Sequence, residues 1–154
     1  MIILSIDPGN IDSAYVLTDN YTLLEFAKID NKSMRDKVIE HSPGHLVIEA
    51  IASYGMAVGK EVFETCFQIG RLMQIADDYN IPCDLVYRKD VKLNLCGSPR
   101  AKDSNIIQAL KDRFGDKGTK ASPGFFYGFS KDVWQAYAVV VTWIDDMKAK
   151  GVIT

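Results

Sequence analysis

The spacing of hydrophobic and polar positions divides the chain into short strands and longer helices, without repeats or linkers between them. A nearly continuous apolar run at the N-terminus is typical of a central strand that is covered on both faces. The next two segments suit an antiparallel meander, which the turn pair Asp19-Asn20 joins. Strands are predicted at residues 1–7, 13–19, 21–29, 45–50 and 81–88.

Apolar residues that recur at steps of three and four predict the helices. These are expected at residues 33–40, 58–79, 89–95, 98–114 and 130–148. Their predicted caps are Ser33, Ser98 and Ser130, with Pro99 in a first turn. The helix at 58–79 has more apolar surface than one sheet contact needs, so we expect it to contact a second subunit. The turn-rich loop at 115–130 is long enough to suggest a functional role.

A meander followed by parallel strands and covering helices predicts a mixed α/β sheet. The length of 154 residues suits one domain, and 47% hydrophobic with 25% charged residues is typical of a soluble globular protein. We find no run that could span a bilayer and no basic start of a signal peptide. The widely spaced Cys66, Cys83 and Cys96 suggest free thiols in a reducing compartment, and hence a cytoplasmic protein without structural zinc.

The net charge of −2 hides an asymmetry along the chain. Residues 88–120 contain nine Lys and Arg against four Asp, which leaves the remainder of the chain acidic. A locally basic third suits a polyanion that binds one face of the protein. An ordinary solvated surface of helices and loops is the alternative explanation.

Three carboxylates stand where predicted elements begin or end. Asp7 closes the first strand, Glu49 closes the fourth, and Asp132 lies at the start of the last helix. If the two strands are neighbours, these acids meet at one sheet edge, where a cation such as Mg²⁺ or Mn²⁺ would hold them together for phosphoryl chemistry. Asp7 could instead start a turn and Asp132 could stabilise a helix terminus, whereas Glu49 has neither role.

Four stretches, spread over nearly the whole chain, carry a recognisable pattern: SIDPGNIDSAYV, LVIEAIASYGMAVGKEVFETCFQIGRL, VYRKDVKLNLCGSPRAKDSNIIQAL and KDVWQAYAVVVTW. In this order they resemble the RuvC-type Holliday-junction resolvases of the ribonuclease H-like fold. The short chain and divergent stretches look like a phage branch of that family. The resemblance implies a five-stranded mixed sheet flanked by helices, and a single nuclease domain over residues 1–154.

The resemblance also assigns roles to the acids. Asp7 and Glu49 match catalytic acids of the family, and Asp132 matches the first of two Asp residues spaced three apart in the last helix. Gln135 stands where the second Asp is usual, and its amide brings an oxygen without charge. We therefore expect one firm Mg²⁺ held by Asp7, Glu49 and Asp132, which Mn²⁺ can replace, and a second that is weak or completed by the substrate phosphate.

Basic residues of such enzymes lie near the scissile phosphate, and Lys102 in the Arg100-Ala101-Lys102 segment is the expected counterpart, although its spacing is offset by one. Tyr54 is expected to stack on a junction base, because the usual aromatic position falls at Ala52. Solvated lysines and a packed tyrosine are the alternatives. The predicted DNA contacts are Tyr54, Arg88, Lys89, Lys92, Arg100, Lys102, Lys117, Lys120 and Lys131.

The expected function is Mg²⁺-dependent cleavage of branched DNA by a homodimer, in the host cytoplasm if a phage encodes it. Neither a small-molecule substrate nor a membrane is expected. Three alternatives stay open: a junction-binding protein that no longer cuts, which Gln135 would permit; a nuclease of forks and flaps; and an actin-like or hexokinase-like phosphotransferase. The last is suggested by the DPGN stretch, but the chain is short for it and shows no second phosphate loop.

Overall fold

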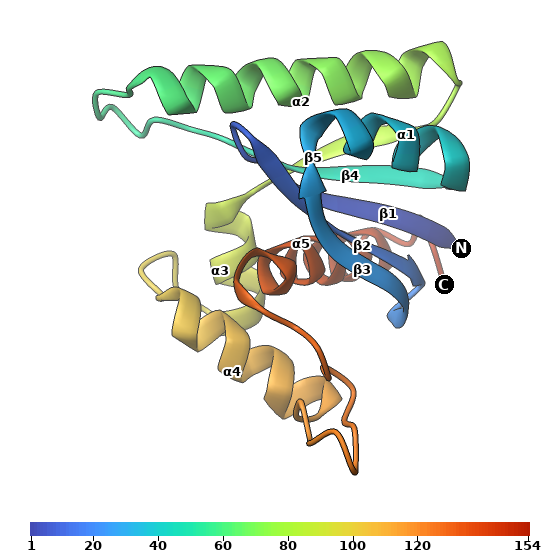
Figure 1. The fold of residues 1–154 in the computed structure, drawn as a ribbon. Coiled ribbons are helices and arrows are strands. Elements are labelled where there is room, and N and C mark those ends of the chain that lie inside the picture. Colours follow the sequence, from blue (N-terminus) through green and yellow to red (C-terminus); the bar gives the residue numbers. More distant parts are fainter.

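Five strands form one mixed sheet in the computed structural model, which describes all 154 residues (Figure 1). The strands are β1 (Ile2–Asp7), β2 (Asp12–Asp19), β3 (Thr22–Asp30), β4 (His45–Ala50) and β5 (Cys83–Tyr87). Their order across the sheet is β3-β2-β1-β4-β5, with β1, β2 and β3 antiparallel and β1, β4 and β5 parallel. The predicted five-stranded mixed sheet is therefore confirmed.

Helices cover both faces of this sheet (Figure 1). One face carries α1 (Asn31–His41) and α2 (Lys60–Asp78), and the other carries α5 (Lys131–Ala149) with α3 (Arg88–Cys96) and α4 (Asp103–Phe114) beyond it. Strand β1 serves both apolar cores, because Ile3 faces α5 whereas Leu4 and Ile6 face α1 and α2. This double burial is why the first apolar run is almost continuous.

Helix α5 is enclosed on all sides between the sheet, α3, α4 and the loop at 115–130. Its residues from Val133 to Ile144 are all buried. The loop contributes Phe126 and Phe129, which are fully buried, and the ring centroid of Phe126 lies 4.7 Å from that of Trp134. The long loop thus fixes the start of α5 by packing. No helix of the chain has the length and apolar character that crossing a membrane requires.

The predicted cap of the first helix is wrong by three positions. Asp30, rather than Ser33, precedes α1, and its carboxylate accepts a hydrogen bond of 3.0 Å from the backbone N–H of Ser33. Asp and Ser both cap well, so the pattern alone could not choose between them.

The predicted start of the fourth helix is also wrong. Helix α4 begins at Asp103, because residues before it form a turn that the Ala101 N–H closes on the Ser98 carbonyl at 3.2 Å. Ser98 is therefore no cap and Pro99 lies outside the helix. Ser130 does precede α5, but its side chain makes no capping hydrogen bond.

Candidate active site

The carboxyl ends of β1 and β4 bring Asp7 and Glu49 together, as the sequence predicted. The two strands are parallel neighbours, with Ile6 paired to Ile48, so the next residue of each strand stands at the same edge of the sheet. The side chain of Glu49 is only 10% exposed, and Asp7 is partly buried. Two acids thus share a poorly solvated place at the edge where parallel strands end.

The turn after β1 fixes the direction of Asp7. A side chain at Gly9 would place its Cβ 2.2 Å from the carbonyl oxygen of Asp12, so only glycine fits there. The Gly9 N–H donates to the Ser13 hydroxyl at 3.2 Å, and the Asn31 amide donates to the Gly9 carbonyl at 3.0 Å. The first acid therefore projects from a turn that neighbouring elements hold in place.

Asp132 comes from the helix layer that covers the sheet, in the first turn of α5. The hydroxyl of Ser5 in β1 donates to the Ala136 carbonyl at 2.8 Å and so ties this end of α5 to the central strand. Burial, the charge of Glu49 and the charge of Asp132 raise the pKa of Asp7 to about 8, although Arg88 opposes them. A cation bound between these acids would favour the ionised form of Asp7 and lower its pKa.

Two cations already pair with the outer members of this group. Lys28 of β3 places its Nζ 2.7 Å from Oδ2 of Asp132, and its hydrogen bond to Asp132 raises the pKa of Lys28. Arg88, at the start of α3, places Nη1 3.1 Å from Oε1 of Glu49 and also binds Asp103. The sequence did not predict Lys28 as a site residue, because no local pattern relates an edge strand to the start of a helix more than a hundred residues away.

No group of three or more His, Cys, Asp or Glu side chains lies in an arrangement that could hold a metal ion. Asp132 is paired with Lys28 instead. Oε2 of Glu49 is nevertheless buried without any hydrogen-bond partner, at the sheet edge that it shares with Asp7. A buried carboxylate oxygen without a donor is costly, and carboxylate oxygens are the ligands that Mg²⁺ prefers. Asp7 and Glu49 therefore fit one hard divalent cation between them.

Gln135 lies one turn after Asp132 and is 7% exposed. It is on the same face of α5, as the spacing of three residues predicted. Neither Lys28 nor Arg88 pairs with it. An uncharged side chain thus lies buried one turn along α5 from Asp132, and Asp132 is the only acid in the first two turns of this helix.

Most of the predicted DNA contacts lie on the surface. The exposed ones are Tyr54, Lys89, Arg100, Lys102, Lys117, Lys120 and Lys131, with Lys92 partly buried. Tyr54 is 62% exposed, in a loop after β4 whose residues are all exposed. Lys102 directly precedes Asp103, the second partner of Arg88. Arg88 differs from the others, because it is partly buried and pairs with both Glu49 and Asp103.

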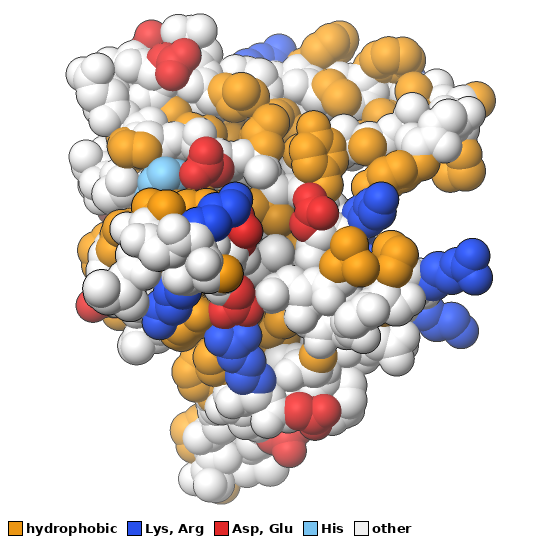
Figure 2. Space-filling model, turned by 180° about the vertical axis from the view of Figure 1, so that it is seen from behind, with side chains coloured by type: hydrophobic (Ala, Val, Ile, Leu, Met, Phe, Trp, Pro, Cys, Tyr) orange, Lys and Arg blue, Asp and Glu red, His pale blue; other side chains and the backbone are white.

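Figure 2 shows basic and hydrophobic side chains around a hollow at one side of the molecule. Lys and Arg side chains project at the right edge, below a hollow, while hydrophobic side chains gather above it over α2 and the loop before it. In Figure 1 the ends of β1 and β4 point to this same side. A basic rim and an apolar rim therefore border the place where the acids meet.

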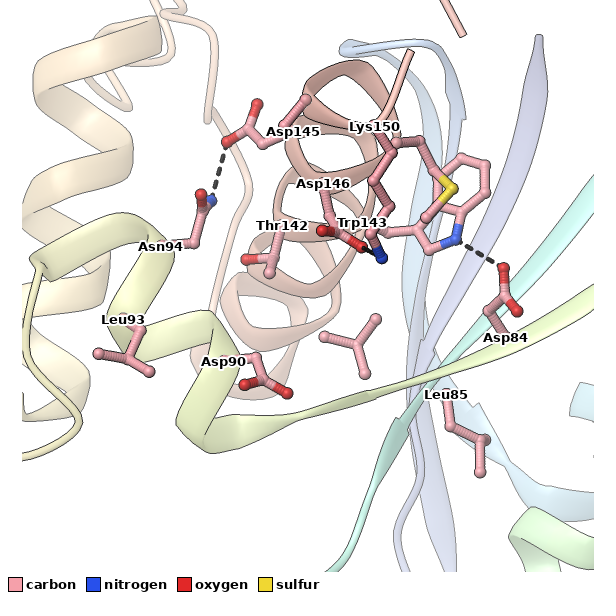
Figure 3. A pocket seen from close by; sticks show the side chains of 13 residues that line it. Asp84, Leu85, Asp90, Leu93, Asn94, Thr142, Trp143, Asp145, Asp146 and Lys150 are labelled. Carbon is pink, nitrogen blue, oxygen red and sulfur yellow. Dashed lines mark hydrogen bonds and ion pairs between the residues drawn. The ribbon is translucent and has the colours of Figure 1, made fainter. Parts of the chain in front are cut away.

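The largest cavity lies elsewhere, between β5, α3 and the C-terminal half of α5 (Figure 3). Its volume is about 710 Å³, and it includes Asp145 and Asp146. The carboxylate of Asp145 is fully engaged, because Tyr21, Asn94 and Arg113 all donate to it. This cavity is remote from Asp132 along α5, and Asp84, Asp145 and Asp146 in it already have partners.

No protein-family model matches the chain, and no curated protein sequence matches it. Solved structures do resemble it. Thermus thermophilus RuvC is 13% identical, with a TM-score of 0.76 over 98% of this chain and 97% of that one. A structure of T. thermophilus RuvC in complex with Holliday junction substrate is 14% identical, with a TM-score of 0.71 over 92% of each chain.

A third similar structure is the yeast mitochondrial Holliday junction resolvase Ydc2. It is 12% identical, with a TM-score of 0.55 over 92% of this chain and 77% of that one. Such likenesses at low identity show the fold, and they confirm the fold expected from the four sequence stretches. The chain therefore has the ribonuclease H-like fold of the RuvC resolvases.

Proposed function

We propose that this protein is a metal-dependent endonuclease that hydrolyses phosphodiesters in branched DNA, four-way junctions above all. The observation that carries the proposal is the pair of Asp7 and Glu49 at the ends of adjacent parallel strands, with one buried oxygen of Glu49 left without a partner. The fold supports it, since a similar structure is described in complex with Holliday junction substrate. The chain would act in the cytoplasm, where its DNA substrate is.

Asp7 and Glu49 would hold a Mg²⁺ ion, which Mn²⁺ could replace, with Asp132 as a further ligand. The bound cation would activate a water molecule and stabilise the leaving oxygen. Arg88 keeps the Glu49 carboxylate in place from the outer side, through Oε1, and so leaves Oε2 directed into the site. With Gln135 uncharged, we expect a second cation to bind weakly or only with substrate phosphate present.

The exposed lysines and arginines around the hollow would bind the phosphate backbone of the junction arms. Lys102 is the residue we place nearest the scissile phosphate, because it precedes Asp103, which shares Arg88 with Glu49. Tyr54, exposed in the loop after β4, would stack on an unpaired base at the junction centre. Such contacts read the shape of the DNA more than its sequence.

The apolar face of α2 would join two copies of the chain. Phe63 and Phe67 are 54% and 58% exposed, and Met73 is 40% exposed on the same helix. So many large apolar side chains on one exposed helix mark a protein contact. A twofold dimer would place two active sites on opposed strands of a four-way junction. Phe67→Glu should convert the dimer to a monomer in sedimentation analysis, whereas Lys60→Glu at the exposed helix start should not.

The test of the proposal is a cleavage assay with labelled four-way, three-way and linear DNA, in Mg²⁺ and in Mn²⁺. We expect cuts in the four-way junction that Asp7→Asn abolishes and that Asp146→Asn, an exposed acid at the far end of α5, leaves unchanged. Preferred cleavage of the three-way substrate would indicate a nuclease of forks and flaps instead. Cuts that survive Asp7→Asn would refute the assignment of the site.

A junction-binding protein without cleavage is the second candidate. Its support is that Asp132 and Glu49 both pair with cations of the chain itself and that no three ligands surround a common point. Tight binding of the four-way junction without cuts in either metal would favour it over the nuclease.

A further inference from the structure

Positive charge is distributed unevenly among the three acids of the site. Asp132 has the ammonium of Lys28 at 2.7 Å and Oε1 of Glu49 has Arg88 at 3.1 Å, whereas Asp7 and Oε2 of Glu49 pair with no cation of the chain. The chain itself therefore supplies a cation to Asp132, and the place left for an external cation lies between Asp7 and Oε2 of Glu49.

The sheet determines where Lys28 lies. Asp7 pairs with Ala14 across β1 and β2, and Ala14 pairs with Lys28 across β2 and β3, so the three residues form one row. The small side chain of Ala14 separates the acid from the lysine. Lys28 therefore reaches the site from a fixed register position, along a path that no large side chain of β2 fills.

The ammonium of Lys28 has more hydrogen-bond donors than its ion pair uses. A lysine carries three N–H donors, and the carboxylate of Asp132 is the partner that holds this one. The side chain is 46% exposed, so its remaining donors face solvent beside the acids. An ammonium that is fixed by one acid and open to solvent can donate to an anion arriving at the same place.

We propose that Lys28 is a catalytic residue, whose ammonium supplies beside Asp132 the positive charge that a second metal ion would otherwise supply and contacts a non-bridging oxygen of the scissile phosphate. This inference rests on the proposed nuclease function. Charge that is positioned before the reaction stabilises the negative charge that develops on the phosphate oxygens. It also explains how an uncharged Gln135 is tolerated. If Lys28 supplies this charge, the site binds no second metal ion and needs no further anion to hold one.

An ordinary surface ion pair would have the same distance but no such role. The chain offers a matched control at the other end of α5, where Lys150 lies 2.6 Å from Asp146 with both side chains at least half exposed. The variants to compare are Lys28→Met, Lys28→Arg and Lys150→Met. Methionine keeps the length of the side chain and removes the charge.

The first measurement is Mn²⁺ binding to the metal-free protein without DNA, by calorimetry. Removing a positive charge next to Asp132 should strengthen Mn²⁺ binding about tenfold in Lys28→Met. Lys28→Arg and Lys150→Met should bind Mn²⁺ as the wild type does. Equal affinities in all four proteins would overturn the proposal.

The second measurement is the rate of junction cleavage at saturating Mg²⁺. We expect Lys28→Met to be slower by about 10²-fold, Lys28→Arg to recover most of the rate, and Lys150→Met to match the wild type. Unchanged or faster cleavage by Lys28→Met would show that Lys28 is dispensable or blocks the site, and would overturn the proposal. If the wild type cuts no DNA, the nuclease function fails, and the Mn²⁺ comparison alone decides whether Lys28 serves this site.

Discussion

Asp7 and Asp145 lie toward opposite ends of α5 and have opposite surroundings. Asp145, near the end of α5, accepts hydrogen bonds from Tyr21 at 2.6 Å, from Asn94 at 2.8 Å and from both terminal nitrogens of Arg113 at 2.7 and 2.9 Å. Burial raises its pKa, but these donors outweigh burial and hold the pKa below its ordinary value. Burial and the neighbouring Glu49 instead raise the pKa of Asp7 to about 8.

The contrast separates an acid that serves the fold from acids that serve a ligand. A carboxylate with four donors stabilises the contact between α5, α3, α4 and the meander. A carboxyl group held beside another acid destabilises the free protein and becomes favourable only when a cation arrives. Mutation of Asp145 should therefore lower the stability of the protein, whereas mutation of Asp7 should lower its activity.

The largest effect is expected for Asp7→Asn on activity. Cleavage of the four-way junction should fall by at least about 10³-fold, because the variant loses the central anion of the site. Thermal unfolding of the metal-free variant at about pH 8 should be no easier than that of the wild type. A large drop in thermal stability would place Asp7 with Asp145 among the structural acids.

Asp145→Ala should show the reverse pattern. Removal of the carboxylate leaves Arg113 and Tyr21 without their partner and should lower the free energy of unfolding by about 2 kcal/mol, since the side chain is 20% exposed. The melting temperature would fall by about 5 °C, measured by calorimetry. Asp146→Asn is the control and should change stability little. Cleavage per folded molecule should stay normal in both variants.

The pH dependence of stability tests the raised pKa of Asp7 directly. A folded-state pKa above the unfolded value means that the folded chain holds the proton more tightly, so the stability contributed by Asp7 falls as pH rises from about 4 to about 8 and then levels off. In EDTA the wild type should lose at least about 1 kcal/mol relative to Asp7→Asn over this window. If the free energy of unfolding changes equally with pH in the two proteins over this window, the raised pKa of Asp7 is refuted.

The smallest effect is expected for Gln135→Asp. Aspartate at position 135 would add an anion one turn from Asp132, so the Mg²⁺ concentration for half-maximal cleavage should fall about threefold and cleavage should become faster. A magnesium titration of cleavage is the measurement, with Gln135→Glu as a longer carboxylate for comparison. An unchanged titration would show that Gln135 takes no part in metal binding.

Much of the fold followed from the sequence because it depends on local patterns. Alternating or continuous apolar runs predicted all five strands, and the acids at their ends predicted the meeting of Asp7 and Glu49. The errors were at helix starts, where several residues compete for one cap. Asp30 precedes α1 in place of Ser33, and α4 starts at Asp103 in place of residue 98.

The sequence by itself determined the elements, the acids that end β1 and β4, and the uncharged Gln135 one turn after Asp132. The tertiary structure alone decided which charges face those acids. Lys28 and Asp132 are 104 positions apart, and Arg88 and Glu49 are 39 apart, so no local pattern could pair them. The physical reason is that strand order and the packing of α5 on the sheet set these distances, and charge acts through space rather than along the chain.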